Sequence, residues 1–210
     1  MKIKALYLAA AIALPVQQVD DWQLLQFSKI EANQVSFSPA GMAVDVNASA
    51  SPIIYPLPQP MLVRRVEVSG ALSNLLEVDT ALQGEGRYDD FTLKIGLVVA
   101  GDKTLNGIQK LFSADWIVTL FNLAPKGAGV DSIYFLNAVQ GEALLGRQRQ
   151  HPLSDLIYEN NVWLLEKPGE FEFTHTLDTP REVIAVWLSI DGDNSRSRYS
   201  TLIRSLRLED

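Results

Sequence analysis

The 210-residue sequence has no cysteine, only two histidines, and fewer basic residues (18) than acidic ones (25). Without cysteine the chain has no disulfide, no thiol nucleophile and no cysteine-ligated zinc or iron–sulfur cluster. His151 and His175 alone leave little for a catalytic triad or a histidine-rich metal site. The net charge of −7 lacks the basic surface that a phosphate backbone requires, so nucleic acid is not an expected partner.

Signatures of common catalytic sites are also missing. The sequence has no G-x-S-x-G elbow, P-loop, G-x-G-x-x-G or H-E-x-x-H string. Glu170 and Glu172 form a carboxylate pair of the kind that glycoside hydrolysis uses. However, their alternation with Phe171 and Phe173 is that of a strand with a polar outer face. We therefore assign no catalytic residue from the sequence.

The N-terminal segment has the features of a secretory signal peptide. Lys2 and Lys4 precede the apolar stretch Ala5–Leu14, and Ala11–Ala13 supplies small residues at an A-x-A site. This pattern predicts a signal peptide over residues 1–13 and a periplasmic or secreted protein. The alternative is a short N-terminal helix packed on the domain. Because a membrane span needs ~20 apolar residues, no span is expected after signal removal.

Residues 20–210 are expected to form a single β-rich domain. Apolar residues alternate over Phe91–Leu97, and the run Val183–Ile190 is apolar on both faces, as in a central strand. Turn residues separate about ten such segments, and Thr104–Ala114 shows helical spacing. Further strands are expected at Pro52–Tyr55, Leu62–Ser69, Val162–Leu165 and Glu170–Thr176, among others. This pattern favours an all-β fold, a two-sheet antiparallel β-sandwich of jelly-roll type with one short helix. A closed barrel is the alternative.

An aspartate-rich string follows the last apolar run. Asp191, Asp193 and Ser195 place oxygen side chains at alternate positions, which suits a calcium ion. Arg196 and Arg198 bring positive charge into the same loop and argue against a cation. The competing interpretation is a polar hairpin turn whose aspartates hydrogen-bond their own backbone. A third interpretation is that these residues contact a ligand directly.

Alternation also predicts a ligand-binding sheet face. We expect the apolar partners in each strand to face the core, among them Ile133 and Phe135 in one strand and Ile184, Val186, Leu188 and Ile190 in another. The opposite face then presents Arg65, Glu67, Lys94, Tyr134 and Trp187. Aromatic rings with flanking charges suit sugars, whose C–H faces stack on rings while their hydroxyls meet polar groups. The alternative is that the helix or a loop covers Tyr134 and Trp187.

A second candidate for ligand contact lies in the segment Gly141–His151, which has the densest positive charge of the chain. On a loop, Arg147 and Arg149 would hold the carboxylate or sulfate of an anionic polysaccharide. A solvated loop with no ligand is the simpler interpretation.

Two stretches, Tyr88–Ile95 and Val183–Ser195, resemble a family of exported bacterial proteins of unknown function. The resemblance implies a β-sandwich like those of carbohydrate-binding modules, and the family offers no catalytic residues to transfer. It also implies that Asp89 or Asp90 meets the Asp191–Asn194 turn, around a cation or in a hydrogen-bond network.

The sequence departs from that family at one point. A tryptophan is expected in the strand after Pro60, where this chain has Arg64 and Arg65. The difference puts any shared aromatic platform in doubt.

These observations lead to one functional hypothesis and two alternatives. The first is a non-catalytic exported protein that binds a glycan or another polar envelope component through a sheet face. A jelly-roll polysaccharide lyase or glycoside hydrolase would instead need an acid and a base in one groove, such as Tyr134 with His151 or Glu172. The third hypothesis is a structural envelope protein with a docking surface for another protein.

Overall fold

The computed structural model describes residues 11–102, 129–151 and 154–210. In these ranges the chain consists of β-strands, turns and two short 3-10 turns. In chain order the elements are β1 (Ala11–Ala13), β2 (Gln23–Leu24), β3 (Gln34–Ser38), β4 (Gly41–Asn47), β5 (Ile53–Leu72), η1 (Gly86–Tyr88), β6 (Lys94–Gly101), β7 (Gly129–Val139), η2 (Glu142–Leu144), β8 (Gln148–Gln150), β9 (Ile157–Leu164), β10 (Gly169–Ser189) and β11 (Arg198–Glu209).

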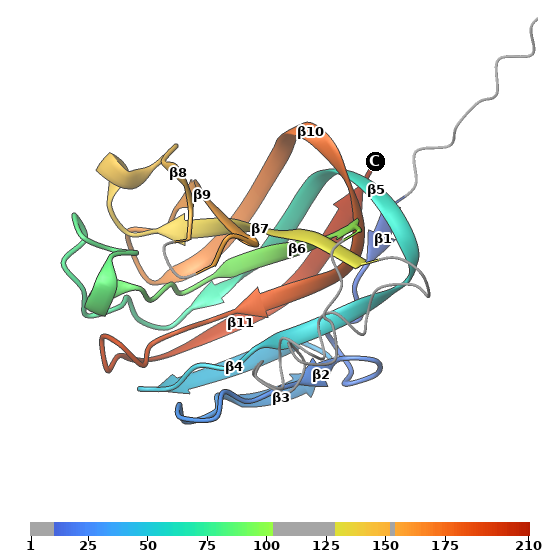
Figure 1. Ribbon diagram of the computed structural model, residues 1–210. Helices are drawn as coiled ribbons and strands as arrows, with labels where there is room; N and C mark the ends of the chain where they lie inside the picture. Colours follow the sequence, from blue (N-terminus) through green and yellow to red (C-terminus); the bar gives the residue numbers. More distant parts are fainter. Residues whose placement is uncertain (1–10, 103–128, 152–153) are drawn as a thin grey trace, which may run out of the picture.

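The strands form one hydrogen-bonded sheet in the order β3-β4-β11-β5-β10-β6-β7-β9-β8, with β1 paired to β11 and β2 to β5. This sheet folds over on itself into two layers (Figure 1). The first layer contains β3, β4 and β11 with the second half of β5 and the first half of β10. The second contains the remaining halves of β5 and β10 with β6, β7, β9 and β8.

The long strands β5 and β10 connect the two layers. They pair along most of their length, and together they arch over at one end of the sandwich (Figure 1). Register shifts interrupt their pairing between residues 176 and 181 of β10 and again between 183 and 185. The facing part of β5, residues 56–60, contains three prolines. Because proline has no N–H to donate, regular pairing lapses here and the ribbon bends.

The main core lies between the inner faces of the two layers. Alternate residues of β4 and β11 in the first layer meet alternate residues of β6, β7 and β10 in the second. Among the fully buried ones are Met42, Val44, Ile203, Leu208, Leu93, Ile95, Leu97, Leu136, Val186, Leu188 and Ile190. Burial of each large apolar side chain contributes about 1.5–3 kcal/mol, so a chain without disulfides can be held by this core.

The outer face of the second layer is apolar as well. Ile54, Ile133, Phe135 and Trp187 form a second cluster there, and the segment that contains Phe27 packs against it. The second layer is therefore covered on both faces, which explains why the run in β10 is apolar throughout.

The all-β sandwich expected from the sequence is confirmed, with two differences. β7 and β9 pair in parallel, so the sheet is not wholly antiparallel. Two pairs of expected strands are each one continuous strand, β5 and β10, because the bends occur without a break in the ribbon. The expected helix at Thr104–Ala114 lies outside the described residues.

The first described residues pair with the last strand. β1 runs antiparallel to β11, and the following Leu14 donates its backbone N–H to the carbonyl of Leu206 at 2.9 Å. Cleavage after Ala13 would remove β1 and leave Leu14, which is buried, at the new terminus. The cleavage position stays a prediction.

In the described ranges, no helix is long and apolar enough to cross a lipid bilayer.

Candidate functional site

A cleft of about 420 Å³ opens on the inner face of the second layer, at its β7–β9–β8 end. One wall comes from these strands, with Tyr134, Tyr158, Asn160, Gln148 and Arg149. The other wall comes from the bend of β10, with Leu177, Asp178, Thr179 and Arg181. We call it the Tyr158 cleft. The bend creates this wall of the cleft, because the irregular part of β10 projects these side chains over the edge of the second layer.

The strand register places the two tyrosines of the Tyr158 cleft together. Tyr134 and Tyr158 are paired positions of the parallel strands β7 and β9, so their side chains project from the same face. Tyr134 is half-buried and packs against the main core, whereas Tyr158 is 40% exposed. The guanidinium of Arg181 lies over the Tyr134 ring, 4.0 Å from its centroid, a cation–π arrangement.

On the opposite face of the same layer lies a buried charged cluster. The Lys94 ammonium is 2.9 Å from Oε1 of Glu159, and both side chains are at most 9% exposed. Lys94 also lies over the rings of Phe91 and Phe135, 4.8 and 4.9 Å from their centroids. Burial alone would lower the pKa of Lys94, but the negative charge of Glu159 raises it, so the pair stays ionised.

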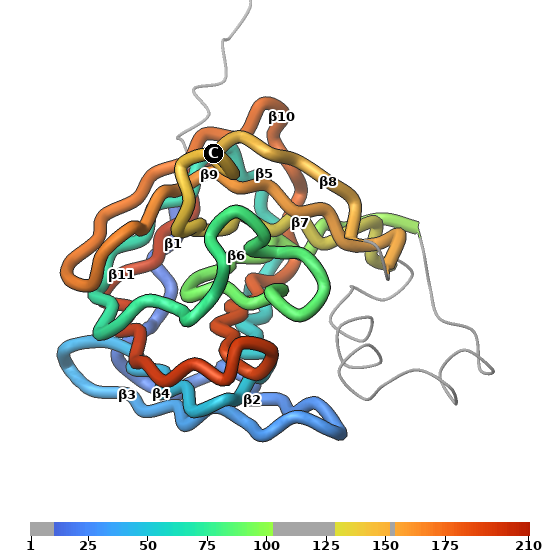
Figure 2. The backbone as a smooth tube through the Cα atoms, turned by 90° about the vertical axis from the view of Figure 1, so that its left-hand side faces the viewer, coloured from blue at the N-terminus to red at the C-terminus, as the bar shows by residue number. Residues whose placement is uncertain are grey.

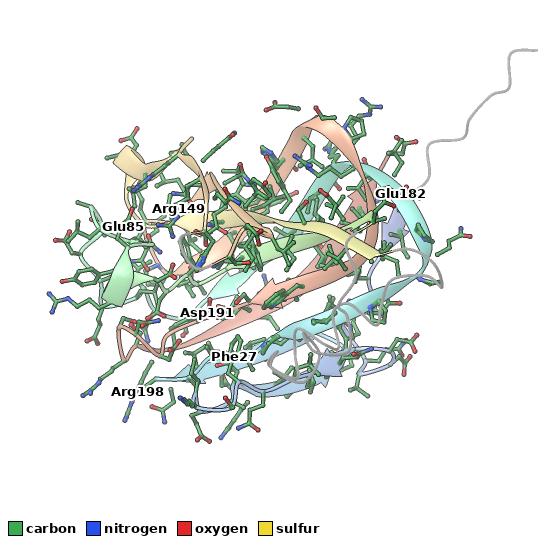
Figure 3. The ribbon with its side chains drawn as sticks, in the orientation of Figure 1. Phe27, Glu85, Arg149, Glu182, Asp191 and Arg198 are labelled. Carbon is green, nitrogen blue, oxygen red and sulfur yellow. The ribbon has the colours of Figure 1, made fainter. Side chains whose placement is uncertain are left out.

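Arg149 extends this cluster toward the surface. Its Nη2 is 2.6 Å from Oε2 of Glu159, and its Nη1 is 3.3 Å from Glu85 (Figure 3). Asp89 is 3.3 Å from Nε2 of His151. Burial would raise the pKa of Asp89, yet the hydrogen bond to His151 and the nearby cations hold it below its usual value. The charges of this cluster therefore largely neutralise one another.

The loop before β6 is fastened to the turn after β10. Asp90 accepts the backbone N–H of Ser195 at 2.6 Å and that of Asn194 at 3.4 Å. Figure 2 shows this loop in green beside the β10–β11 turn in red. The meeting of Asp90 with the turn, implied by the family resemblance, is thus present as a hydrogen-bond network. β10 and β11 do not pair with each other, so the turn is not a hairpin but a crossing between layers.

Asp191, at the start of this turn, is a buried carboxyl group. Both of its oxygens accept the hydroxyl of Ser189, at 2.8 and 3.0 Å. Burial raises the pKa of Asp191 to about 7, although Lys94 and the Ser189 hydroxyl lower it. The negative charges of Asp90 and Asp193 raise it further.

This raised pKa predicts a pH-dependent stability. The folded protein keeps a proton on Asp191 that the unfolded chain releases near pH 4, so the stabilisation is complete below about pH 4 and is lost as the pH rises through 7. Between pH 5 and pH 8 we expect the free energy of unfolding of the wild type to fall by an amount on the order of 2 kcal/mol because of Asp191. The variant Asp191→Asn should not show this decrease. Urea unfolding of both proteins at the two pH values measures this difference. Equal pH slopes for variant and wild type would contradict the assignment.

The sheet face predicted from alternation is not assembled. Lys94 and Trp187 lie on the outer face of the second layer, but Tyr134 lies on its inner face. Arg65 and Glu67 lie on the outer face of the first layer, where they pair with each other at 2.5 Å. The prediction was wrong because Ile133 and Phe135, taken as core residues, belong to the outer cluster rather than the main core.

Trp187 is covered rather than presented to a ligand. It is 3% exposed, and its ring meets Phe135 edge-to-face with centroids 5.3 Å apart. A pocket of about 320 Å³ adjoins it on this outer face and includes Lys94 and Asp191. The paired charges at that pocket distinguish it from the Tyr158 cleft.

The two predicted anion-binding arginines are already paired within the chain. Arg147 is 2.5 Å from Glu85, and Arg149 makes the ion pairs with Glu159 and Glu85 described above. Arg149 is among the residues that line the Tyr158 cleft, but its guanidinium is held by Glu159 and Glu85 in the charged cluster on the opposite face of the layer.

The predicted calcium ligands are engaged by donors of the chain. Asp90 is occupied by N–H groups of the turn, Asp191 by Ser189, and the Ser195 hydroxyl lies 2.6 Å from that of Ser197. A cation would have to displace these donors. The calcium site at Asp191, Asp193 and Ser195, with Asp89 and Asp90, stays a prediction.

In the described part of the chain, Asp89, His151 and Glu159 place potential ligand atoms within 4.8 Å of one another. Arg149 and Lys94 already neutralise Glu159, so this arrangement suits an ion-pair network better than a cation site.

The residues considered for a catalytic pair are separated. Tyr134 lies on the inner face of the second layer, whereas His151 lies beside Asp89 in the outer charged cluster. Glu172 is an exposed residue in the part of β10 that belongs to the first layer. The structure therefore does not bring either proposed acid–base pair together in one groove.

Sequence reasoning did not identify the main residues of the Tyr158 cleft. Tyr158 and Asn160 belong to β9, whose predicted start at Val162 was five residues too late. Arg181 and Asp178 lie at a bend whose position depends on pairing between distant segments.

Comparisons with known proteins found distant structural similarities. No family model and no curated protein matches the chain. A solved xylan-binding module, CBM15, has a TM-score of 0.39 and 11% sequence identity, with 96% of each chain covered. A mutant xylanase 10C from Cellvibrio japonicus, in complex with xylopentaose, has a TM-score of 0.35 and 11% identity, over 94% of this chain and 28% of the other. At these TM-scores and identities the similarity carries no argument about this chain.

Proposed function

We propose that this chain is a non-catalytic binding protein that holds a glycan in the Tyr158 cleft. The observation that carries the proposal is the cleft itself, where two tyrosine side chains share one face beside several hydrogen-bonding groups. An exported location, suggested by the N-terminal sequence, and a polysaccharide or envelope component as partner belong to the same proposal.

The cleft chemistry suits a sugar. The exposed ring of Tyr158 offers an apolar surface on which the C–H face of a pyranose can stack. Gln148 on β8 provides an amide group and Asp178 on the bend provides a carboxylate, so a donor and acceptors flank the ring for sugar hydroxyls. Asn160 is buried and already donates its amide N–H to the carbonyl of Phe135 at 3.2 Å, so it supports the wall of the cleft. Small-molecule sites commonly combine an aromatic surface with a few placed polar groups in this way.

The alternative of a protein-docking surface has less support. The large apolar side chains exposed in the described ranges come from different segments of the chain: Val19, Leu24, Leu62, Leu82, Leu145 and, in the cleft itself, Tyr158. Single exposed apolar residues of this kind are normal on a soluble domain.

Retention on a panel of polysaccharides tests the proposal. Affinity electrophoresis through gels that contain xylan, mixed-linkage glucan, galactan, mannan or polygalacturonate should show retarded migration on at least one of them. Calorimetry with a soluble oligosaccharide of that polymer then gives the dissociation constant. We expect Tyr158→Ala to raise the dissociation constant about tenfold or more, because loss of a stacking ring costs roughly 1.4 kcal/mol or above of binding free energy.

Tyr88→Ala is the matched control for this variant. Tyr88 is a partly exposed tyrosine in η1, outside the cleft, and it contacts Arg87. Its replacement should leave binding unchanged. Equal affinities for Tyr158→Ala and Tyr88→Ala, or no retention on any polymer, would contradict the proposal.

A further inference from the structure

Arg181 lies in the Tyr158 cleft and has no anionic partner within the part of the chain that the structure describes. Its guanidinium lies over the Tyr134 ring, and its Nε is buried with no hydrogen-bond partner among the described residues. No carboxylate of residues 11–102, 129–151 or 154–210 lies within 4.0 Å of it, although Asp178 lines the same cleft. A buried hydrogen-bond donor that has no acceptor costs free energy. A ligand that supplies an acceptor to this donor therefore gains binding free energy.

Arg149, the other arginine that lines the cleft, differs from Arg181 because it already has anionic partners within the chain. Arg149 is neutralised by Glu159 and Glu85, and its neighbour Arg147 pairs with Glu85. Positive charge available to a ligand in this cleft therefore resides on Arg181. Contact with the ring of Tyr134 restricts the motion of this guanidinium, which lowers the entropy cost of a two-point contact with a ligand.

We propose that the glycan bound in the Tyr158 cleft carries a carboxylate, and that Arg181 binds this group through a forked pair of hydrogen bonds. This inference rests on the proposed function and names its ligand class, a polysaccharide that contains uronic acid. A planar carboxylate matches the guanidinium fork, whereas a neutral sugar leaves the charge uncompensated. The Asp178 carboxylate repels an anion elsewhere in the cleft and accepts sugar hydroxyls instead, so the bound acid is directed to Arg181.

Methyl esterification provides a test that changes the charge alone. Polygalacturonate and its fully methyl-esterified form share one backbone, and calorimetry with soluble oligomers of each compares their affinities at pH 7. We expect the acid to bind at least tenfold more tightly than the ester. Arg181→Gln should abolish that difference, and Arg181→Lys, which keeps the charge but loses the fork, should retain part of it. Alginate and glucuronoxylan, each compared with its ester, cover other uronic acids.

The outcomes separate this inference from the proposed function. If a neutral polymer or the esters bind as tightly as the acids, and Tyr158→Ala still abolishes binding, the uronate assignment is wrong and glycan binding stands. If a sulfated galactan binds as tightly as the uronates, the assignment to a carboxylate is wrong. If no polymer binds, both proposals fail. Thermal unfolding of each Arg181 variant shows whether a lost affinity reflects a lost fold.

Discussion

Replacement of Glu159 by alanine is expected to lower the free energy of unfolding by about 3–5 kcal/mol. Glu159 is 2% exposed and is the carboxylate that compensates Lys94, whose ammonium is buried among aromatic rings. Without it, a buried positive charge has lost its closest partner. Arg149 also loses its contact with Glu159 but keeps Glu85 and Asp89, so Lys94 carries most of the loss. Urea unfolding at pH 7 measures the change.

A double variant distinguishes lost charge compensation from lost packing. In Lys94→Met with Glu159→Leu, both charges are replaced by apolar groups of similar volume, a change that is often neutral in other proteins. We expect the double variant to be more stable than Glu159→Ala alone. A Glu159→Ala protein within about 1 kcal/mol of the wild type would show that the pair is not buried as described.

Replacement of Trp187 by alanine is expected to destabilise the protein by about 3–5 kcal/mol while leaving the affinity of the folded fraction for glycan unchanged. The indole is 3% exposed and packs against Phe135 in the outer cluster, on the face opposite the Tyr158 cleft. Its loss removes apolar contact and leaves a cavity. Chemical denaturation measures the stability, and calorimetry at a temperature where the variant is folded measures the affinity.

Trp187→Phe serves as the milder control. It keeps an aromatic ring against Phe135 and should cost less than the alanine variant. If Trp187→Ala were as stable as the wild type but failed to bind a glycan, the outer face would be the binding surface and the Tyr158 cleft would not.

The sandwich could be predicted from the sequence because its strands have a strong local pattern. The alternation of Leu93 and Ile95 with Lys94 correctly separated core residues from the opposite face. In β10 the same reasoning failed at Ile184, which was expected in the main core with Val186 but lies in the outer cluster. A register shift between Val183 and Ala185 reverses the alternation at that point. Such an irregularity depends on pairing with other strands, so it has no local signature.

The candidate site was harder to predict for a related reason. Alternation shows which residues of a strand share a face, but not which face meets the main core when both faces are apolar. Tyr134 was therefore placed with Trp187 on the wrong side of the second layer. Its actual neighbours in the cleft, Tyr158 and Arg181, come from a parallel pairing and from a bend, and both are set by contacts distant in sequence.

The most direct test of glycan binding in the Tyr158 cleft is one calorimetric comparison of Tyr158→Ala with Trp187→Ala. Both variants remove an aromatic ring from the second layer, on its inner and outer face respectively. With an oligosaccharide that the wild type binds, we predict that Tyr158→Ala loses affinity about tenfold or more and that folded Trp187→Ala retains it. The reverse result would contradict the account.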